Sequence, residues 1–139
     1  MTSIGIAVVE WSGRFLVGVR GDDGPLPGDA EFPGGKCHPG ESPRDAACRE
    51  CAEETGLIVR PIRLLHNQTW TYPHGTVDLN FWLCRPADPQ AVTGSHHRFD
   101  WHSAAELRTM RFPAANRTVI DLLSATTRSI RHRQGDSAP

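Results

Sequence analysis

A helix with both ends marked in the sequence is the feature that most constrains the fold of this chain. Ser42 can accept hydrogen bonds from the free amides of a first helical turn, and Pro43 loses no hydrogen bond at the first helical position. Gly56 supplies the stop, because glycine readily takes the left-handed backbone conformation that ends many helices. The sequence therefore predicts a helix from about Pro43 to Thr55, against which the remaining elements must pack.

Stretches on both sides of this helix are patterned as strands. Aliphatic and β-branched residues fill Ile4 to Val9 and Phe15 to Val19, which predicts a hairpin across the Ser12-Gly13 turn. In Val77 to Leu83 apolar residues recur at every second position, as in a strand with one face in the core. Three further strands are predicted, with a turn at Asn67 between the first two: Leu57 to Leu65, Gln68 to Tyr72 and Phe99 to His102.

Loops and a second helix fill the rest of the pattern. Gly21 to Asp29 is too rich in Gly, Pro and Asp for a strand or helix, so it is predicted as a surface loop, closed by a turn at Glu31 to Gly35. Ala87 to His97 is predicted as another loop. Apolar residues at helical spacing predict a second helix from Ala114 to Leu123, and Arg131 to Pro139 is expected to be a flexible tail.

Size and charge narrow the classes of protein. A chain of 139 residues fits one compact domain, which we place at residues 1–130 with a tail at 131–139. The formal net charge of −1 provides no broad basic field for long nucleic acid, although small phosphorylated ligands fit locally placed groups. The apolar run near the N-terminus is short and has no basic segment before it, so we expect a cytoplasmic protein without a membrane partner, either monomer or homodimer.

The four cysteines are predicted to be reduced thiols. Their spacing does not resemble the dense framework of disulfides that stabilises small secreted domains. Cys48 and Cys51 could suggest zinc or redox chemistry, but both fall inside the predicted helix and no second pair with metal spacing follows. They are therefore expected to be core residues.

Three glutamates crowd one face of the predicted helix. At about 3.6 residues per turn, Glu50, Glu53 and Glu54 project from a single patch, and Glu41 lies one loop away. Like charges at this spacing destabilise a helix by roughly 0.2 to 0.5 kcal/mol per pair. A divalent cation would reverse that effect, and hard oxygen ligands of this kind suit Mg²⁺. From the carboxylates alone, a solvated acidic helix face remains the alternative.

The segment around these glutamates resembles the Nudix box. That motif runs Gly, five residues, Glu, seven residues, Arg-Glu, an aliphatic residue, any residue, Glu-Glu, any residue, Gly, aliphatic. The one departure is Cys51 at the first aliphatic position, where a small buried hydrophobe also fits. The matching residues are Gly35, Glu41, Arg49, Glu50, Glu53, Glu54, Gly56 and Leu57.

The resemblance implies an α/β (α+β) fold, a Nudix-type α/β/α sandwich with a mixed β-sheet. It also implies a hydrolase that uses Mg²⁺, for which Mn²⁺ can substitute, held by Glu50, Glu53, Glu54 and the Gly34 carbonyl. Arg49 would orient the carboxylates, and Glu41 would brace the loop or join the outer shell of the metal. Either Glu50 or Glu53 would act as base for the attacking water, and family members differ on which.

Outside the box the chain is similar to the MutT-like branch of the family, which hydrolyses nucleoside triphosphates to monophosphate and pyrophosphate and includes enzymes that remove 8-oxo-dGTP from the nucleotide pool. Arg20 matches a substrate-contacting arginine of that branch. The stretch Glu31-Phe32-Pro33 matches the segment that places backbone groups against base and metal. Asn116, in the run Phe-Pro-Ala-Ala-Asn, matches an asparagine that reads the purine edge, since an amide offers both donors and an acceptor.

Two departures from that branch keep the substrate open. The stretch Tyr72 to Thr76 has no arginine where 8-oxo-dGTP enzymes can carry one. The loop before Phe99 has no glutamate for a further metal ligand, which leaves Asp100, or else His96 or His97, as the candidate. CTP, dCTP or another nucleoside diphosphate derivative such as ADP-ribose are therefore alternative substrates. A nucleotide sensor without catalysis is the alternative outside the enzymes.

Overall fold

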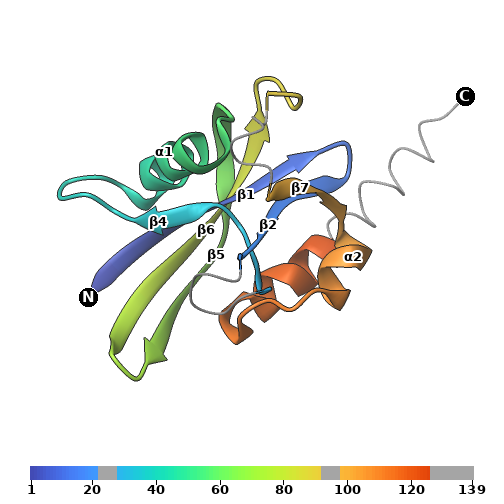
Figure 1. The fold of residues 1–139 in the computed structure, drawn as a ribbon. Helices are drawn as coiled ribbons and strands as arrows, with labels where there is room; N and C mark the ends of the chain where they lie inside the picture. Colours follow the sequence, from blue (N-terminus) through green and yellow to red (C-terminus); the bar gives the residue numbers. More distant parts are fainter. Residues whose placement is uncertain (22–27, 92–97, 126–139) are drawn as a thin grey trace, which may run out of the picture.

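A mixed sheet of seven strands forms the framework of the protein. The computed structural model describes residues 1–21, 28–91 and 98–125 (Figure 1). Within those residues the strand order is β3-β2-β1-β6-β5, with β4 paired to β1 and β7 paired to β2. The pairing of β1 with β6 is parallel and the other pairings are antiparallel. The strands are β1 (Thr2–Trp11), β2 (Arg14–Val19), β3 (Ala30–Glu31), β4 (Gly34–Lys36), β5 (Val59–Tyr72), β6 (Gly75–Pro86) and β7 (Phe99–Ser103).

The central strand β1 changes its neighbour along one of its edges. Near its start, Ile4 to Ile6 pair with β4, and at its far end Glu10 and Trp11 pair with β2 in the predicted hairpin. Between these two pairings, the Ala7 N–H donates to the Pro33 carbonyl over 2.8 Å. The short run from β3 to β4 therefore crosses from one part of the sheet to the other, beside β1.

Helix α1 (Pro43–Thr55) covers one face of the sheet. The predicted cap is present, since the Ser42 hydroxyl accepts the Asp45 N–H and Gly56 ends the helix with a φ of 78°. Ala46, Ala47 and Cys51 are fully buried. A Cβ on Gly5 of β1 would overlap the backbone at Pro43 and Ala47, so glycine at this position lets α1 approach the sheet closely.

The opposite face is covered by α2 (Ala104–Thr109), the 3-10 helix η2 (Ala114–Asn116) and the helical residues 117–125. With α1 on the other side, this arrangement confirms the predicted α/β/α sandwich, as Figure 1 shows. The larger of two core clusters lies on this face and joins the sheet to these helices through Val8, Phe15, Val17, Phe81, Leu107, Val119 and Leu123. In the described part of the chain, no helix is long and apolar enough to span a membrane.

Several predicted boundaries were wrong. Strand β5 is continuous through the predicted turn at Asn67, with register shifts only at Pro61/Arg63 and Leu64/His66. The Asn67 amide instead reaches across to β6, donating to Asp78 and to Asn80. The predicted turn at Glu31 to Gly35 is partly taken up by β3 and β4.

Helix α2 was missed, although its capping box of Ser103 and Glu106 is visible in the sequence. The predicted second helix begins as the 3-10 turn η2 and continues as helix at residues 117–125. Most of the loop predicted after Arg20, most of the loop predicted before Phe99, and the predicted tail lie outside the described residues.

Candidate active site

Arg49 ties the loop after β4 to helix α1. Its Nε and Nη2 atoms donate to the two carboxylate oxygens of Glu41 over 2.8 and 2.9 Å, and Nη2 also donates to the Lys36 carbonyl over 3.1 Å. The Glu41 carboxylate accepts the His38 N–H as well. The hydrogen bonds from Arg49, followed by the one from His38, lower the pKa of Glu41 to about 2. Glu41 is thus an ionised brace between loop and helix.

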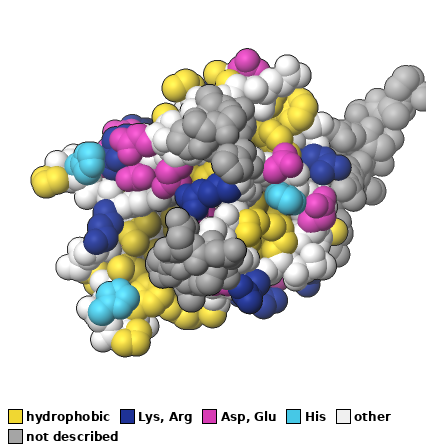
Figure 2. All heavy atoms as spheres, viewed as in Figure 1, with side chains coloured by type: hydrophobic (Ala, Val, Ile, Leu, Met, Phe, Trp, Pro, Cys, Tyr) yellow, Lys and Arg dark blue, Asp and Glu magenta, His cyan; other side chains and the backbone are white. Residues whose placement is uncertain are grey.

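The same guanidinium holds two of the three helix glutamates. Its Nη1 atom donates to Glu50 over 3.0 Å and lies 3.3 Å from both carboxylate oxygens of Glu53. The Glu53 side chain is 57% exposed, whereas that of Glu50 is 20% exposed. On the face drawn in Figure 2, acidic and basic side chains accordingly gather together over α1.

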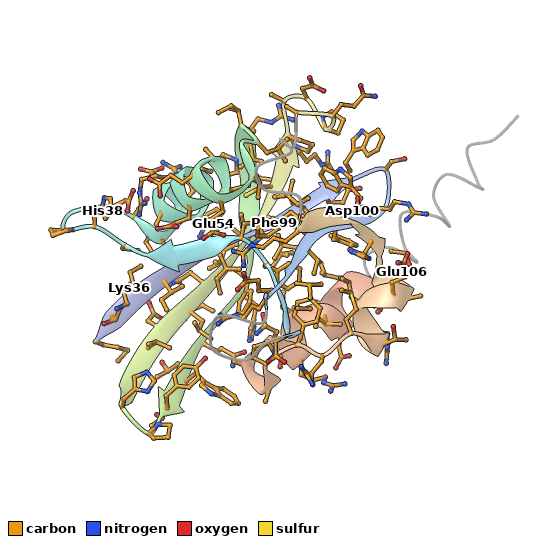
Figure 3. All side chains as sticks on the ribbon, in the orientation of Figure 1. Lys36, His38, Glu54, Phe99, Asp100 and Glu106 are labelled. Atoms are coloured by element: carbon orange, nitrogen blue, oxygen red, sulfur yellow. The ribbon has the colours of Figure 1, made fainter. Side chains whose placement is uncertain are left out.

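Glu54 points inward, between α1 and β4, as Figure 3 shows. Its carboxyl group is in hydrogen-bonding contact with Glu50. Burial, then the charge and hydrogen bond of Glu50 and the charge of Glu31, raise the pKa of Glu54 to about 8, although the Gly34 N–H opposes the shift. A carboxyl group in this setting is more readily ionised when a cation lies beside it.

Gly34 and Gly35 bring the backbone of β4 against these glutamates. A Cβ on Gly35 would lie 2.5 Å from the carboxyl carbon of Glu50, and one on Gly34 would lie 2.6 Å from the Gly5 carbonyl oxygen. A side chain at Gly34 would therefore push the segment away from β1, whereas one at Gly35 would displace the Glu50 carboxylate. The two glycines allow backbone and carboxylates to meet directly.

These donors fit a divalent cation of the Mg²⁺ or Mn²⁺ type. Glu50 and Glu54 present carboxyl oxygens to one another beside the backbone of Gly34, and hard cations prefer oxygen donors. Across residues 1–21, 28–91 and 98–125, no three His, Cys, Asp or Glu side chains already converge in the arrangement of a metal cage. In this arrangement Arg49 pairs with Glu50 and Glu53.

A cleft of about 230 Å³ opens on the other side of Gly34 and Gly35. Its apolar lining includes Ile4, Ile6 and Leu79 from the central strands. The wall residue Phe32 packs on Phe112, with ring centroids 5.1 Å apart. The remaining lining residues are Arg20, Glu31, Tyr72, Pro113 and Asn116. A ligand with a flat apolar ring and polar edges would match this lining, and phosphate groups on the same ligand would extend toward the glutamates.

Most of the predicted substrate residues meet in this cleft. Arg20, Glu31, Phe32 and Asn116 all line it, although they come from three separate parts of the chain. Pro33 does not line it, because its side chain is buried and its carbonyl bonds to β1. The Asn116 amide donates to the Pro113 carbonyl over 3.4 Å, a long contact that leaves the amide able to exchange partners.

Glu31 is held by two arginines at the edge of the cleft. Arg20 Nε donates to one carboxylate oxygen over 3.0 Å, and Arg98 Nη2 lies 3.1 Å from the other. Arg98 was not predicted, and no local pattern marks it, since only the pairing of β7 with β2 brings it close to Glu31. Asp29 and Arg111 were also missed, because their contact joins segments 82 positions apart.

Asp100 lies apart from this cluster. It is exposed on β7, where its carboxylate accepts the N–H of Trp101 over 2.7 Å, and Figure 3 shows Phe99 between it and Glu54. It does not line the cleft. The other candidates for that ligand, His96 and His97, lie outside the described residues.

Comparisons with known proteins agree with this geometry. The model of the NUDIX domain matches residues 1–123. The 8-oxo-dGTP diphosphatase of Escherichia coli K12 is 32% identical over 101 residues, which cover 73% of this chain and 78% of that protein. The CTP pyrophosphohydrolase of the same organism is 33% identical over 91 residues, covering 55% of this chain and 67% of that protein.

Solved structures show the same architecture. The solution structure of the E. coli ORF135 protein has a TM-score of 0.71 and 26% identity, covering all of this chain and 95% of that one. The crystal structure of the MutT protein from Methanosarcina mazei Go1 has a TM-score of 0.74 and 22% identity, covering 90% and 94%. At that identity the second likeness shows the fold alone.

Proposed function

Because the chain belongs to the Nudix family of pyrophosphohydrolases, we propose that it uses Mg²⁺ to hydrolyse a nucleoside triphosphate to the monophosphate and pyrophosphate. The observation that carries this proposal is the shared wall of Gly34 and Gly35. Both glycines line the cleft, and both also meet the acidic face of α1, Gly35 against Glu50 and Gly34 against Glu54. A nucleotide whose base lies in the cleft can therefore extend its phosphates to the glutamates.

The acidic side chains divide the work of the site. Glu50, Glu53 and Glu54, with the Gly34 carbonyl, would hold Mg²⁺, which when bound withdraws charge from the phosphate oxygens. Arg49 keeps Glu50 and Glu53 in place, and Glu41 keeps Arg49 in place. Either Glu50 or Glu53 accepts a proton from the attacking water, and the substitutions Glu50→Gln and Glu53→Gln distinguish them, because loss of the general base removes the acidic limb of the pH–rate profile.

The base edge is read at the other end of the cleft. Asn116 offers donors and an acceptor, and Glu31 offers carboxylate oxygens that Arg20 and Arg98 orient. An oxidised guanine such as that of 8-oxo-dGTP is our first candidate, supported by the relative of that name. CTP is the second, supported by the relative named CTP pyrophosphohydrolase.

We further propose that residues 1–130 form one catalytic domain that acts on free nucleotides in the cytoplasm. The match of the family model to residues 1–123 supports the first part. The near-neutral net charge of −1 supports the preference for free nucleotides over long nucleic acid.

A substrate panel with product identification tests the proposed function. The panel compares 8-oxo-dGTP, dGTP, CTP, dCTP and ADP-ribose by kcat/KM in Mg²⁺ and Mn²⁺, since discrimination resides in that ratio. We expect monophosphate and pyrophosphate from a triphosphate. Ribose phosphate and AMP from ADP-ribose as the preferred reaction, or tight binding without turnover, would contradict the proposal.

A further inference from the structure

Three segments far apart in the sequence form the polar side of the cleft. They are Arg20 just after β2, the segment of Glu31 and Phe32 at the end of β3, and the segment from Pro113 to Asn116 that includes η2. Asp29 lines no part of the cleft, yet it lies where the three segments meet and is only 8% exposed. A buried acidic residue at such a junction needs a structural explanation.

Asp29 is bonded to two of the segments. Its carbonyl accepts the Arg20 N–H over 2.9 Å, and its carboxylate accepts the Arg111 Nε–H over 2.5 Å. The next residue, Ala30, donates its N–H to the Arg111 carbonyl over 2.8 Å. We call the side-chain pair of Asp29 and Arg111 the Asp29–Arg111 brace.

The backbone around the brace is shaped to admit the arginine. Gly28 has a φ of +81°, and a Cβ there would lie 2.9 Å from Arg111 Nη2. The Asp29 side chain is 12% exposed and that of Arg111 is 69% exposed, so the cation reaches a buried anion from the solvent side. Removal of the cation would leave that anion without this charge partner in a place of low solvation.

We propose that the Asp29–Arg111 brace fixes the spacing between Phe32 and Asn116 across the cleft and so sets the selectivity for the nucleobase. This inference rests on the proposed function, since it assigns the base to the cleft. The brace acts as a positioning pair and touches no substrate. Its influence reaches the cleft through short stretches of chain, because Phe112 follows Arg111 directly and packs on Phe32.

The effect on the cleft follows from the geometry of hydrogen bonding. A base edge is distinguished by donors and acceptors placed within a few tenths of an ångström, and hydrogen bonds weaken steeply when misaligned. Without the brace, the segment from Arg111 to Asn116 keeps its backbone hydrogen bond to Ala30. It loses the side-chain contact with Asp29 that prevents the segment from shifting along β3. Selectivity among bases should therefore fall before binding of the phosphates is affected.

The test compares Arg111→Met, Asp29→Asn and Arg111→Lys with the control Arg85→Met. Arg85 suits the control because it too is an exposed arginine that pairs with a mostly buried acid, Glu10, at the opposite end of β1 from the Gly34–Gly35 wall. Steady-state rates are measured with 8-oxo-dGTP, dGTP and CTP. We expect Arg111→Met and Asp29→Asn to raise the KM of the preferred nucleotide about tenfold, which is less than the roughly hundredfold loss of activity that a small misplacement of substrate can cause. Their kcat should change less than about twofold, and Arg111→Lys should restore most of the preference.

Equilibrium binding in the absence of turnover keeps this test separate from that of the proposed function. Affinities for the three nucleotides and for inorganic triphosphate, which has no base, are measured for the same variants. We expect Arg111→Met and Asp29→Asn to weaken nucleotide binding and leave inorganic triphosphate unchanged, whatever products the wild-type protein forms. The inference is overturned if inorganic triphosphate and the nucleotides lose affinity equally, if Arg111→Met behaves like Arg85→Met, or if no nucleotide binds. If Arg111→Met does not fold, Asp29→Asn and Arg111→Lys decide the question.

Discussion

The carboxyl group of Glu54 destabilises the metal-free protein. Burial and the contact with Glu50 disfavour its charge, whereas a bound cation would favour it. In a chelator at pH 8, we expect Glu54→Gln to raise the free energy of unfolding by roughly 1 kcal/mol, as relief of strain at active sites often does. Turnover in Mg²⁺ should fall by about 100-fold or more. Thermal unfolding and steady-state rates measure the two effects.

The control for Glu54 is Glu10→Gln. Glu10 is also a mostly buried glutamate, 13% exposed and paired with Arg85, and it lines no part of the cleft. Its substitution should leave turnover near the wild-type value. A Glu54→Gln protein that hydrolyses substrate as fast as this control would exclude the carboxylate from the reaction.

Arg49 makes contacts that lysine cannot reproduce. Its planar fork reaches both oxygens of Glu41, the Lys36 carbonyl, and the carboxylates of Glu50 and Glu53. An ammonium group is a single point of charge, so Arg49→Lys should lose several of these bonds and lower kcat/KM on the order of tenfold. Arg44→Lys is the matched control, since Arg44 is an exposed arginine of the same helix paired only with Asp45 among the ion pairs of the described residues. Equal rates for the two variants would show that the fork has no role.

At the scale of elements, two glycines test how closely α1 must approach the sheet. A Cβ on Gly5 would meet backbone atoms of α1, which cannot move without moving the helix, whereas a Cβ on Gly35 would meet the end of the Glu50 side chain. We expect Gly5→Ala to destabilise the protein by about 2 kcal/mol, as overpacking commonly does. Gly35→Ala should keep the unfolding temperature but lose most turnover, because it displaces Glu50. The opposite assignment, a stable Gly5→Ala and an unstable Gly35→Ala, would contradict this explanation.

Local signals predicted some elements and failed for others. Helix α1 was predicted correctly because its ends depend on Ser42, Pro43 and Gly56, which act on their own neighbours. Strand β5 was wrongly divided at Asn67 because the amide is satisfied by β6, across the sheet, rather than by a turn. Helix α2, with only six residues, is too short for a clear periodic pattern, although its capping box was readable.

At the scale of the whole molecule, the acidic face and the cleft come from different parts of the chain, which allows a prediction about the joint binding of metal and nucleotide. The acidic face comes from α1, whereas the cleft comes from the sheet strands β1, β3, β4, β5 and β6, from Arg20 after β2 and from η2 with the residue before it, and the phosphates of a nucleotide would join the two through the cation. Mg²⁺ and nucleotide together should therefore raise the unfolding temperature by more than the sum of their separate effects. At about 100 times Kd the stabilisation is about 2.7 kcal/mol, on the order of 10 °C for a chain of this size. Strictly additive shifts would argue against a bridged complex.

The same separation explains how much of the site was readable from the sequence. Glu50, Glu53 and Glu54 share one helix, so their proximity follows from helical geometry alone. That Arg20, Phe32 and Asn116 line one cleft was available only through the family resemblance and is seen in the structure. Arg98 and the Asp29–Arg111 brace depend on tertiary contacts between distant segments, which no periodic pattern records.

The parallel pairing of β1 with β6 also determines when the protein can assemble during its synthesis. Ser3 lies against Asp78, 75 positions later, so β1 has no partner on that side until the residues of β6 have also been synthesised. At roughly 5 to 20 residues per second, this delay lasts on the order of several seconds. Closing so long a loop is slow, and during the wait the apolar β1 is exposed to aggregation. Chaperone demand and yield on expression should therefore respond more to β1 and β6 than to the glutamates of α1.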